Sequence, residues 1–480
     1  MIFSAAISIL IPLLIGLLLV CLLWPNQKFT LSLFLIQASL AAAPGIGFFS
    51  CCFFLLLCFH GPSRSGLLAL QLTVLVSLGA ALAYRLKTKR REEAVEVSRK
   101  ASGRFRFRRI LGAAFLVALI SAIITFIFVS LERPHGDWDA WAVHNMRARF
   151  IFRAGDQWRD VFSDLLEWSS PDYPLMIPGS IAGFWTLIGN DTVVVPAMLA
   201  LLFTFATVGL LTSSLWVLRS RSQGFLAGLI LLCTPLFITH GASQYLDIPF
   251  GFLCLATLTL VSLHESLPKG NNLLLLAGAS AALSAWTKNE GLLFLVAILV
   301  GRFAVIVAKR GLSVSIKQML SFGAGLLPVF AVLIYFKNHF AKSNAFLSPQ
   351  GQSTLAKLID PSRYLQILDA SKDQILTFGA WPVSIGVLLA FYLLLMGITV
   401  DEKLRQAIGT SMIAFSIVLA GYFIIYLITP RDLAWHLLVS LNRLFLQLYP
   451  SLLFVYFLVV RSPEDALMRK DTQLAAVALD

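Results

Sequence analysis

Four short polar segments interrupt the long apolar runs of this chain, and each carries side chains that could bind or activate a substrate. They are residues 136–141 (GDWDAW), 170–174 (SPDYP), 240–247 (HGASQYLD) and 286–290 (WTKNE). A carboxylate can accept the proton of a hydroxyl group, and a lysine or arginine can stabilise a departing anion. The segments are far apart in sequence, so they form one site only if the fold brings them to the same side.

The composition identifies the elements that must position these segments. Hydrophobic residues make up 58% of the 480 residues and charged residues 13%, and the mean hydropathy is +0.82. These values exclude a soluble domain of ordinary make-up. The apolar runs reach the roughly 17–25 residues that a helix needs to cross a bilayer, without the alternation of barrel strands. We predict thirteen spans, near residues 1–23, 31–59, 66–84, 110–131, 191–217, 224–240, 248–264, 272–287, 290–308, 318–336, 377–399, 407–429 and 438–460.

A basic segment sets the predicted orientation. Residues 85–109 contain eleven lysines or arginines against three glutamates, which is typical of a loop retained in the cytoplasm. We interpret its charge as attraction to anionic membrane lipids and expect no nucleic-acid partner. With this loop inside, alternation of the spans places all four polar segments on the outer face. The predicted organisation is N-terminal helices of unassigned role, a cytoplasmic loop, a catalytic membrane domain with an outer loop at 132–190, and a cytoplasmic tail, over residues 1–84, 85–109, 110–460 and 461–480.

The outer loop is too polar to cross the membrane and too apolar to be fully solvated. Its apolar side chains recur at helical spacing at Trp158, Val161, Phe162, Leu165 and Trp168. This pattern predicts a helix lying in the headgroup plane, with Asp156 as its N-cap. Residues 174–189 are apolar but short, so we predict a juxtamembrane or re-entrant helix there.

The order and common sidedness of the four motifs resemble the GT-C glycosyltransferases, especially the branch of protein O-mannosyltransferases and aminoarabinose–lipid A transferases. The likeness covers roughly residues 110–460. It implies an all-α polytopic membrane protein, a GT-C-like bundle of about 13 transmembrane helices with a juxtamembrane helical outer loop. It also implies transfer of a sugar from a polyprenyl-phosphate-linked donor to a lipid, glycan or protein acceptor, by inverting displacement.

The resemblance places Asp139 where the family has its catalytic aspartate. The family often has an Asp-Glu pair where this chain has Asp137-Trp138-Asp139, so Asp137 is the second candidate for the base or an orienting partner. A carboxylate two residues from another can raise its pKa. In the alternative interpretation, either aspartate caps a helix that begins near Ala140. Both interpretations remain open from the sequence.

Two basic residues are predicted to bind the phosphate of the donor. Lys288 lies between apolar runs, and a charge so close to hydrocarbon is a functional hypothesis by default. Arg443 lies just inside a span and can bind phosphate through two nitrogens. The alternatives are a lysine paired with Glu290 and an arginine that anchors its helix at the interface.

Further residues of the outer face are predicted to contact the sugar or the acceptor. We expect Asp247 to bind hydroxyl groups, although it could equally cap the helix that it opens. Aromatic side chains such as Trp141 could stack on a sugar, but an aromatic belt at the membrane interface also explains them. The complete predicted set is Asp172, Tyr173, Asp247, Glu290, Trp141 and His436. The histidines match no metal-binding spacing, so we expect no metal and no cofactor.

A secondary transporter is the main alternative function. In that case Asp247, Lys288 and Glu290 would be coupling or substrate-binding groups. Transporters place such groups near the membrane midplane and often contain internal repeats, whereas these charges lie at span ends and no repeat is evident. We therefore favour an enzyme of the plasma (inner) membrane with its active site on the extracytoplasmic side.

Overall fold

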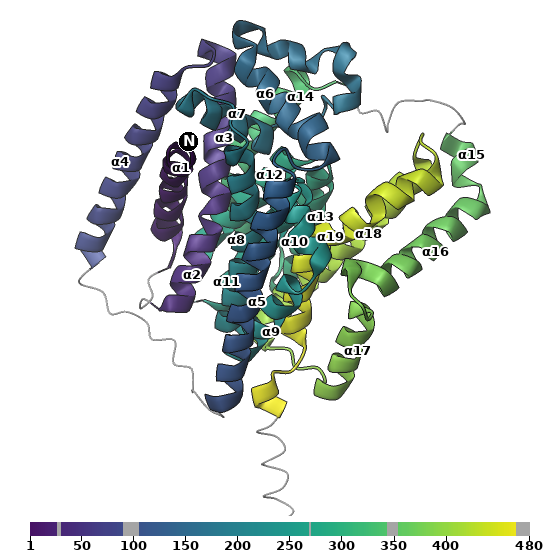
Figure 1. The fold of residues 1–480 in the computed structure, drawn as a ribbon. Coiled ribbons are helices and arrows are strands. Elements are labelled where there is room, and N and C mark those ends of the chain that lie inside the picture. Colours follow the sequence, from purple (N-terminus) through teal and green to yellow (C-terminus); the bar gives the residue numbers. More distant parts are fainter. Residues whose placement is uncertain (26–29, 90–104, 268–269, 343–353, 467–480) are drawn as a thin grey trace, which may run out of the picture.

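The computed structural model describes residues 1–25, 30–89, 105–267, 270–342 and 354–466, and this part of the chain is almost entirely helical (Figure 1). Within it, the β-structure is an isolated antiparallel bridge between Ile398 and Val460. The centre of the basic segment 85–109 and most of the tail 461–480 fall outside the described residues. The expected class, an all-α polytopic membrane protein, is confirmed.

The first four helices form one flank of the bundle. They are α1 (Ile2–Leu23), α2 (Leu31–Leu40), α3 (Ala42–His60) and α4 (Arg64–Lys89). Helix α3 packs against α7 and also contacts α12. Ser50 of α3 accepts a hydrogen bond from Trp286 Nε1 (3.1 Å) and donates one to Leu175 O (3.1 Å). Helix α3, which had no assigned role, therefore bonds to the segment 286–290 and to the residue that follows the segment 170–174.

The next elements lead to one end of the bundle and cover it. They are α5 (Phe105–Glu132), the π-helix η1 (Ala140–His144), α6 (Asn145–Arg153), the 3-10 helices η2 (Gly155–Phe162) and η3 (Asp164–Ser169), and α7 (Met176–Ile188). In Figure 1 this covering lies at the top and the start of α5 lies at the bottom, whereas α4 descends along the left side and ends at about mid-height. The covering and the start of α5, which flanks the basic loop, are thus at opposite ends of the molecule.

The prediction of one continuous interfacial helix in the outer segment is wrong. Two 3-10 helices replace it, and Asp156 lies in the first turn of η2, whose N-cap is Ala154. Trp158 and Phe162 are buried against the bundle, whereas Leu165 and Trp168 are exposed. The apolar side chains therefore divide between core and surface, which one continuous helix face could not do. The short helix expected within 174–189 is present as α7, and it is almost wholly buried.

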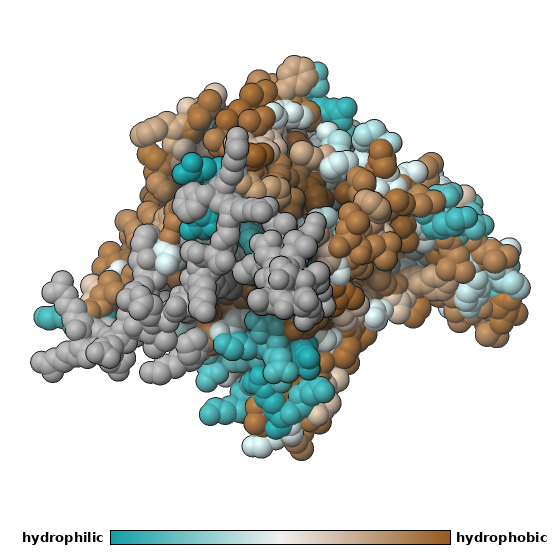
Figure 2. All heavy atoms as spheres, turned by 90° about the horizontal axis from the view of Figure 1, so that it is seen from below, coloured by the Kyte–Doolittle hydropathy of each residue, from teal (hydrophilic) through white to brown (hydrophobic). Residues whose placement is uncertain are grey.

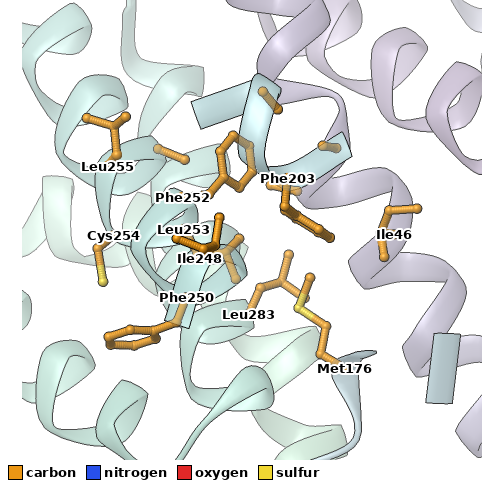
Figure 3. Packing of buried hydrophobic residues seen from close by; sticks show 14 of the residues in the cluster. Ile46, Met176, Phe203, Ile248, Phe250, Phe252, Leu253, Cys254, Leu255 and Leu283 are labelled. Atoms are coloured by element: carbon orange, nitrogen blue, oxygen red, sulfur yellow. The ribbon is translucent and has the colours of Figure 1, made fainter. Parts of the chain in front are cut away.

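The central helices follow α7. They are α8 (Val194–Leu218), α9 (Arg221–Leu232), α10 (Pro235–Ala242), α11 (Asp247–Ser266), η4 (Gly270–Asn272), α12 (Leu273–Thr287), α13 (Glu290–Arg310) and α14 (Leu312–His339). Helix α11 lies at the centre of the core, and its residues from Asp247 to His264 are all buried. Figure 3 shows its residues Phe252 and Leu253 among side chains of other helices, including Phe203 and Met176.

Helix α11 carries a buried carboxylate at each end. Asp247 at its first residue belongs to the polar end described below. At the other end, the buried Glu265 pairs with Arg302 of α13 and with Arg310. Arg302 is fully buried and also donates to Gln318 of α14 (2.7 Å). Both ends of the central helix are therefore held by ion pairs to neighbouring helices.

The last elements form the other flank and return to the core. They are α15 (Thr354–Leu358), α16 (Pro361–Thr377), η5 (Phe378–Ala380), α17 (Ile385–Met396), η6 (Glu402–Leu404), α18 (Arg405–Ile428) and α19 (Leu433–Val459). Helix α19 packs on α11, helped by Gly251, because a Cβ there would lie 2.9 Å from Gln447 O. Seen from the lower end, brown apolar side chains cover most of the visible flanks (Figure 2). Such a surface suits lipid contact.

Thirteen full spans were too many. Ten described helices are long and apolar enough to cross a membrane, or twelve if two bent pairs each count as one. The span predicted at 224–240 breaks before Pro235, where α9 and α10 meet at 63°, and that at 377–399 follows an 86° bend. The span predicted at 272–287 is α12, which has 15 residues. Proline and glycine residues at the two breaks end the helices locally.

Candidate active site

The turn between α12 and α13 places Lys288 inside the bundle. Helix α12 ends at Thr287, Lys288 is extended (φ −145°, ψ 157°), and α13 begins at Glu290. Gly291 permits this tight reversal, because a Cβ there would lie 2.1 Å from Ser284 O. The Lys288 ammonium contacts Asp247 (2.9 Å) and Glu290 (3.0 Å). Burial by itself lowers the pKa of Lys288, but these two carboxylates outweigh it and raise the pKa above its ordinary value. The side chain therefore stays charged.

Asp247 joins the two basic residues. It is the first residue of α11 and is fully buried. Its Oδ1 accepts hydrogen bonds from Lys288 Nζ (2.9 Å) and Gln447 Nε2 (2.6 Å), and its Oδ2 accepts one from Arg443 Nε (3.0 Å). A buried carboxylate needs such partners to offset its desolvation. Asp247 is thus enclosed by donors of the protein, which differs from the open hydroxyl-binding position that the sequence predicted.

Gln447 presents its amide nitrogen to Asp247 because Tyr422 fixes the other end of the amide. The Tyr422 hydroxyl donates to Gln447 Oε1 (2.8 Å), and Gln447 Nε2 then faces the carboxylate. Both residues are buried in the bundle. The sequence analysis missed them. A usable signal was present, because Gln447 lies four residues after Arg443 and so on the same helix face.

Arg443 connects Asp247 to Asp139. It lies in α19, and its Nη2 is 2.5 Å from Asp139 Oδ2 while its Nε contacts Asp247. The guanidinium also lies over the ring of Tyr245, 4.6 Å from the centroid. Such stacking restricts a planar guanidinium to one orientation. Interface anchoring, the alternative for Arg443, does not describe this buried and doubly paired side chain.

The loop before η1 is tied to the turn before α11, and this brings Asp139 to Arg443. Gly136 has φ +77°, and a Cβ there would lie 2.7 Å from Ser243 O, so the position favours glycine. The Asp137 amide donates to Ser243 O (3.1 Å). Asn145 Nδ2 donates to Gln244 Oε1 (2.7 Å). Residues 136 and 243 therefore lie side by side.

The two aspartates of the acidic motif point to different partners. Asp137 pairs with Arg133 (2.8 Å) and accepts the amide of Trp138, and both members of this ion pair are exposed. Asp139 precedes η1, but its carboxylate makes no hydrogen bond to the amides of that helix, all of which are described. The capping interpretation therefore does not hold for Asp139, and only Asp139 of the pair contacts Arg443 in the described structure.

The charged groups form a continuous chain that is buried in its middle and partly exposed at both ends. In order of contact it runs Asp139, Arg443, Asp247, Lys288 and Glu290. The relative exposures of these side chains are 27%, 19%, 0%, 7% and 15% in the same order. Solvent or a ligand can thus approach Asp139, Arg443 and Glu290, while Asp247 forms the floor. We refer to these five residues as the charged chain.

A second network fixes the segment 170–174 beside the charged chain. Asp172 Oδ2 accepts from Asn289 Nδ2 (2.6 Å), and Lys337 donates to Asp172 O and to Asn289 Oδ1 (both 2.7 Å). The buried Arg147 donates to the carbonyl of Tyr173 (3.0 Å). Glu290 raises the pKa of Tyr173, and burial adds to the shift. Tyr173 therefore stays a neutral hydroxyl near Glu290, whose Oε2 is buried without a hydrogen-bond partner among the described residues.

Two predicted site residues lie away from the charged chain. Trp141 is exposed and packs edge-on against Trp138, with centroids 4.9 Å apart. His436 is buried and packs against Tyr426, with centroids 4.9 Å apart. Trp286, also considered for an aromatic belt, is fully buried in the core instead. Among the described residues, no three His, Cys, Asp or Glu side chains are grouped as metal ligands.

Residues 172–336 match the family model of the dolichyl-phosphate-mannose-protein mannosyltransferases. The matched third of the chain contains Asp172, Asp247, Lys288 and Glu290, whereas Asp139 and Arg443 lie outside it. No curated protein and no solved structure gives a significant match. The family match agrees with the glycosyltransferase resemblance and does not select a branch within it.

Proposed function

We propose that this protein is a membrane glycosyltransferase that moves a sugar from a polyprenyl-phosphate-linked donor to a lipid, glycan or protein acceptor. The observation that carries the proposal is the charged chain, assembled from four segments at one end of an apolar bundle. Residues 172–336 of the protein also match a family named for sugar transfer from a dolichyl phosphate. A combination of an accessible carboxylate, a buried lysine and a partly buried arginine is what such a transfer needs.

The proposed reaction is a single displacement with inversion. The acceptor oxygen forms a bond to the anomeric carbon, and the bond from that carbon to the phosphate oxygen breaks. The electron pair leaves with the polyprenyl phosphate, which requires no proton, and the acceptor proton goes to Asp139. Asp139 suits the base because it is accessible and does not cap a helix. Asp137, paired with Arg133, is better suited to hold the loop.

Lys288 and Arg443 are the proposed ligands of the donor phosphate. Asp247 holds both cations in place, and Gln447 in turn holds Asp247. Glu290, with its unpartnered Oε2 beside Tyr173, is placed to receive a hydroxyl group of the sugar or acceptor. Asp172 orders the neighbouring turn through Asn289. The exposed Trp141 lies further out, where it could contact an acceptor or the headgroup layer.

We place the active site on the extracytoplasmic side of the plasma (inner) membrane. The support is geometric, because Asp139 directly precedes η1 and α6, and α6 lies at the upper end of the bundle, whereas the start of α5, one flank of the basic segment, lies at the lower end (Figure 1). Basic loops between spans are retained in the cytoplasm. Labelling of single cysteines at positions 87 and 168 should find them in opposite compartments.

Replacing Lys288 with alanine should weaken donor binding by about 10–150-fold, the range for a lost hydrogen bond to a charged group. The measurement is binding of a polyprenyl-phosphate sugar to the purified variant in detergent. Lys342→Ala is the matched control, because Lys342 pairs with the exposed Asp164 on the same face of the protein. Equal affinities of the two variants would make Lys288 a structural lysine.

The function itself is tested by incubating the purified protein with a panel of polyprenyl-phosphate sugars and acceptors and following release of the carrier phosphate. We expect release with one donor class, dependent on acceptor, and its loss in Arg443→Gln. Acceptor-independent uptake of a soluble solute into proteoliposomes, with no carrier release from any donor, would favour the transporter instead.

A further inference from the structure

Arg443 has two carboxylate partners that differ in how firmly they are held. Asp247 is fully buried and accepts three hydrogen bonds, one from Gln447, which Tyr422 fixes. Asp139 is 27% exposed, lies in the first helical turn of the covering, and its carboxylate bonds to Arg443 alone among the described residues. The contact with Asp247 is therefore built into the bundle, whereas the contact with Asp139 can be exchanged.

The same pairing conflicts with both roles proposed for these residues. An arginine that already holds a carboxylate at 2.5 Å has that Nη2 position filled and cannot offer it to a phosphate. A carboxylate that is bonded to a guanidinium is also not directed at an acceptor hydroxyl. The observed arrangement is thus suited to the protein without its donor.

Building on the proposed function, we propose that Asp139 occupies the phosphate position on Arg443 and that the donor phosphate displaces it. The phosphate then bonds to Arg443 Nη2 and Nη1, while Arg443 Nε keeps Asp247. The released Asp139 turns to the acceptor hydroxyl. The ligand class is a phosphodiester monoanion, with the same charge as the carboxylate that it replaces.

Charge counting supports an exchange over simple addition. The charged chain holds three carboxylates and two cations, so its net charge is −1 before any ligand binds. A phosphodiester added without displacement would lie against Asp139 with no cation left for it. Moving Asp139 away reduces this repulsion, and the acceptor proton then neutralises the carboxylate during transfer.

The exchange predicts that removing the base tightens binding of the donor. Asp139→Asn should bind a short-chain polyprenyl-phosphate sugar, which is a phosphodiester, about 5–30-fold more tightly than the unaltered protein, because a competing anion is gone. The probe is added to detergent-solubilised protein, and binding is followed by thermophoresis. Asp139→Ala is a second variant that does not depend on how an asparagine amide is oriented.

Asp137→Asn is the matched control. It removes one negative charge two residues away, from a carboxylate that pairs with Arg133 and does not touch Arg443. A gain of less than about 2-fold there would separate direct competition from general electrostatics. Similar gains in the Asp137 and Asp139 variants, or an affinity unchanged or lowered in both Asp139 variants, would overturn the exchange.

Sugar transfer measured in the same preparations separates the two proposals. Lost transfer without tighter donor binding in the Asp139 variants contradicts the exchange and leaves the proposed function in place. Full transfer in Asp139→Asn contradicts the proposed base, and the exchange with it.

Discussion

Replacing Asp139 with asparagine is expected to slow sugar transfer by about 10²–10⁴-fold, the usual contribution of a positioned general base. The amide keeps the shape of the carboxylate but cannot accept the proton of the acceptor hydroxyl. The measurement is the initial rate of transfer at saturating donor and acceptor, so that a change in donor affinity does not mask the effect on kcat.

Asp137→Asn is again the control for this prediction, and we expect its rate to stay within a few-fold of the unaltered protein. The exposed Asp137 pairs with Arg133 and is turned from Arg443. The reverse result, a lost rate in Asp137→Asn and a normal rate in Asp139→Asn, would assign the base to the other aspartate.

Replacing Asp247 with asparagine should destabilise the protein by about 3–5 kcal/mol, because removing one partner of a buried ion pair leaves uncompensated charge. Two cations, Lys288 and Arg443, lose their common anion in this variant. The measurement is thermal unfolding in detergent. Asp191→Asn is the matched comparison, because Asp191 also pairs with two basic residues, Arg149 and Arg153, but at the surface. Its cost should be near 1 kcal/mol or below.

A double replacement makes the Asp247 prediction more specific. In Asp247→Asn with Lys288→Met, the buried cation that has lost one of its two carboxylates is also removed, and Arg443 keeps Asp139. Part of the lost stability should return, since residues in contact couple by about 0.5–3 kcal/mol. Strictly additive losses would show that Asp247 and Lys288 do not depend on each other.

The sequence predicted the membrane class and much of the charged chain for a simple physical reason. A charged residue between long apolar runs is costly unless it has a partner, so Lys288 and Asp247 are conspicuous without any structure. The distribution of basic residues between the spans then predicted that their segments lie on the same side of the membrane. What the sequence could not supply was the pairing, because Asp139 and Arg443 are 304 residues apart.

The remaining errors come from packing that local patterns do not record. The short helix α12 is apolar enough for a span, yet it is held inside the bundle, where a full bilayer length is not required. His436 and Trp286 were placed at the outer interface because of their sequence positions, and packing of neighbouring helices buries both side chains, which the sequence did not indicate. Gln447 was overlooked because an amide in an apolar run attracts less notice than a charge.

The two buried carboxylates of α11 have a mechanical consequence. Sliding or tilting this helix would separate Asp247 from three donors at one end and Glu265 from two arginines at the other. The ion pairs at both ends therefore hold this central helix in one position relative to its neighbours. A transporter that alternates between inward-open and outward-open conformations needs central helices that can move. An enzyme benefits from a central helix that keeps its site residues in place.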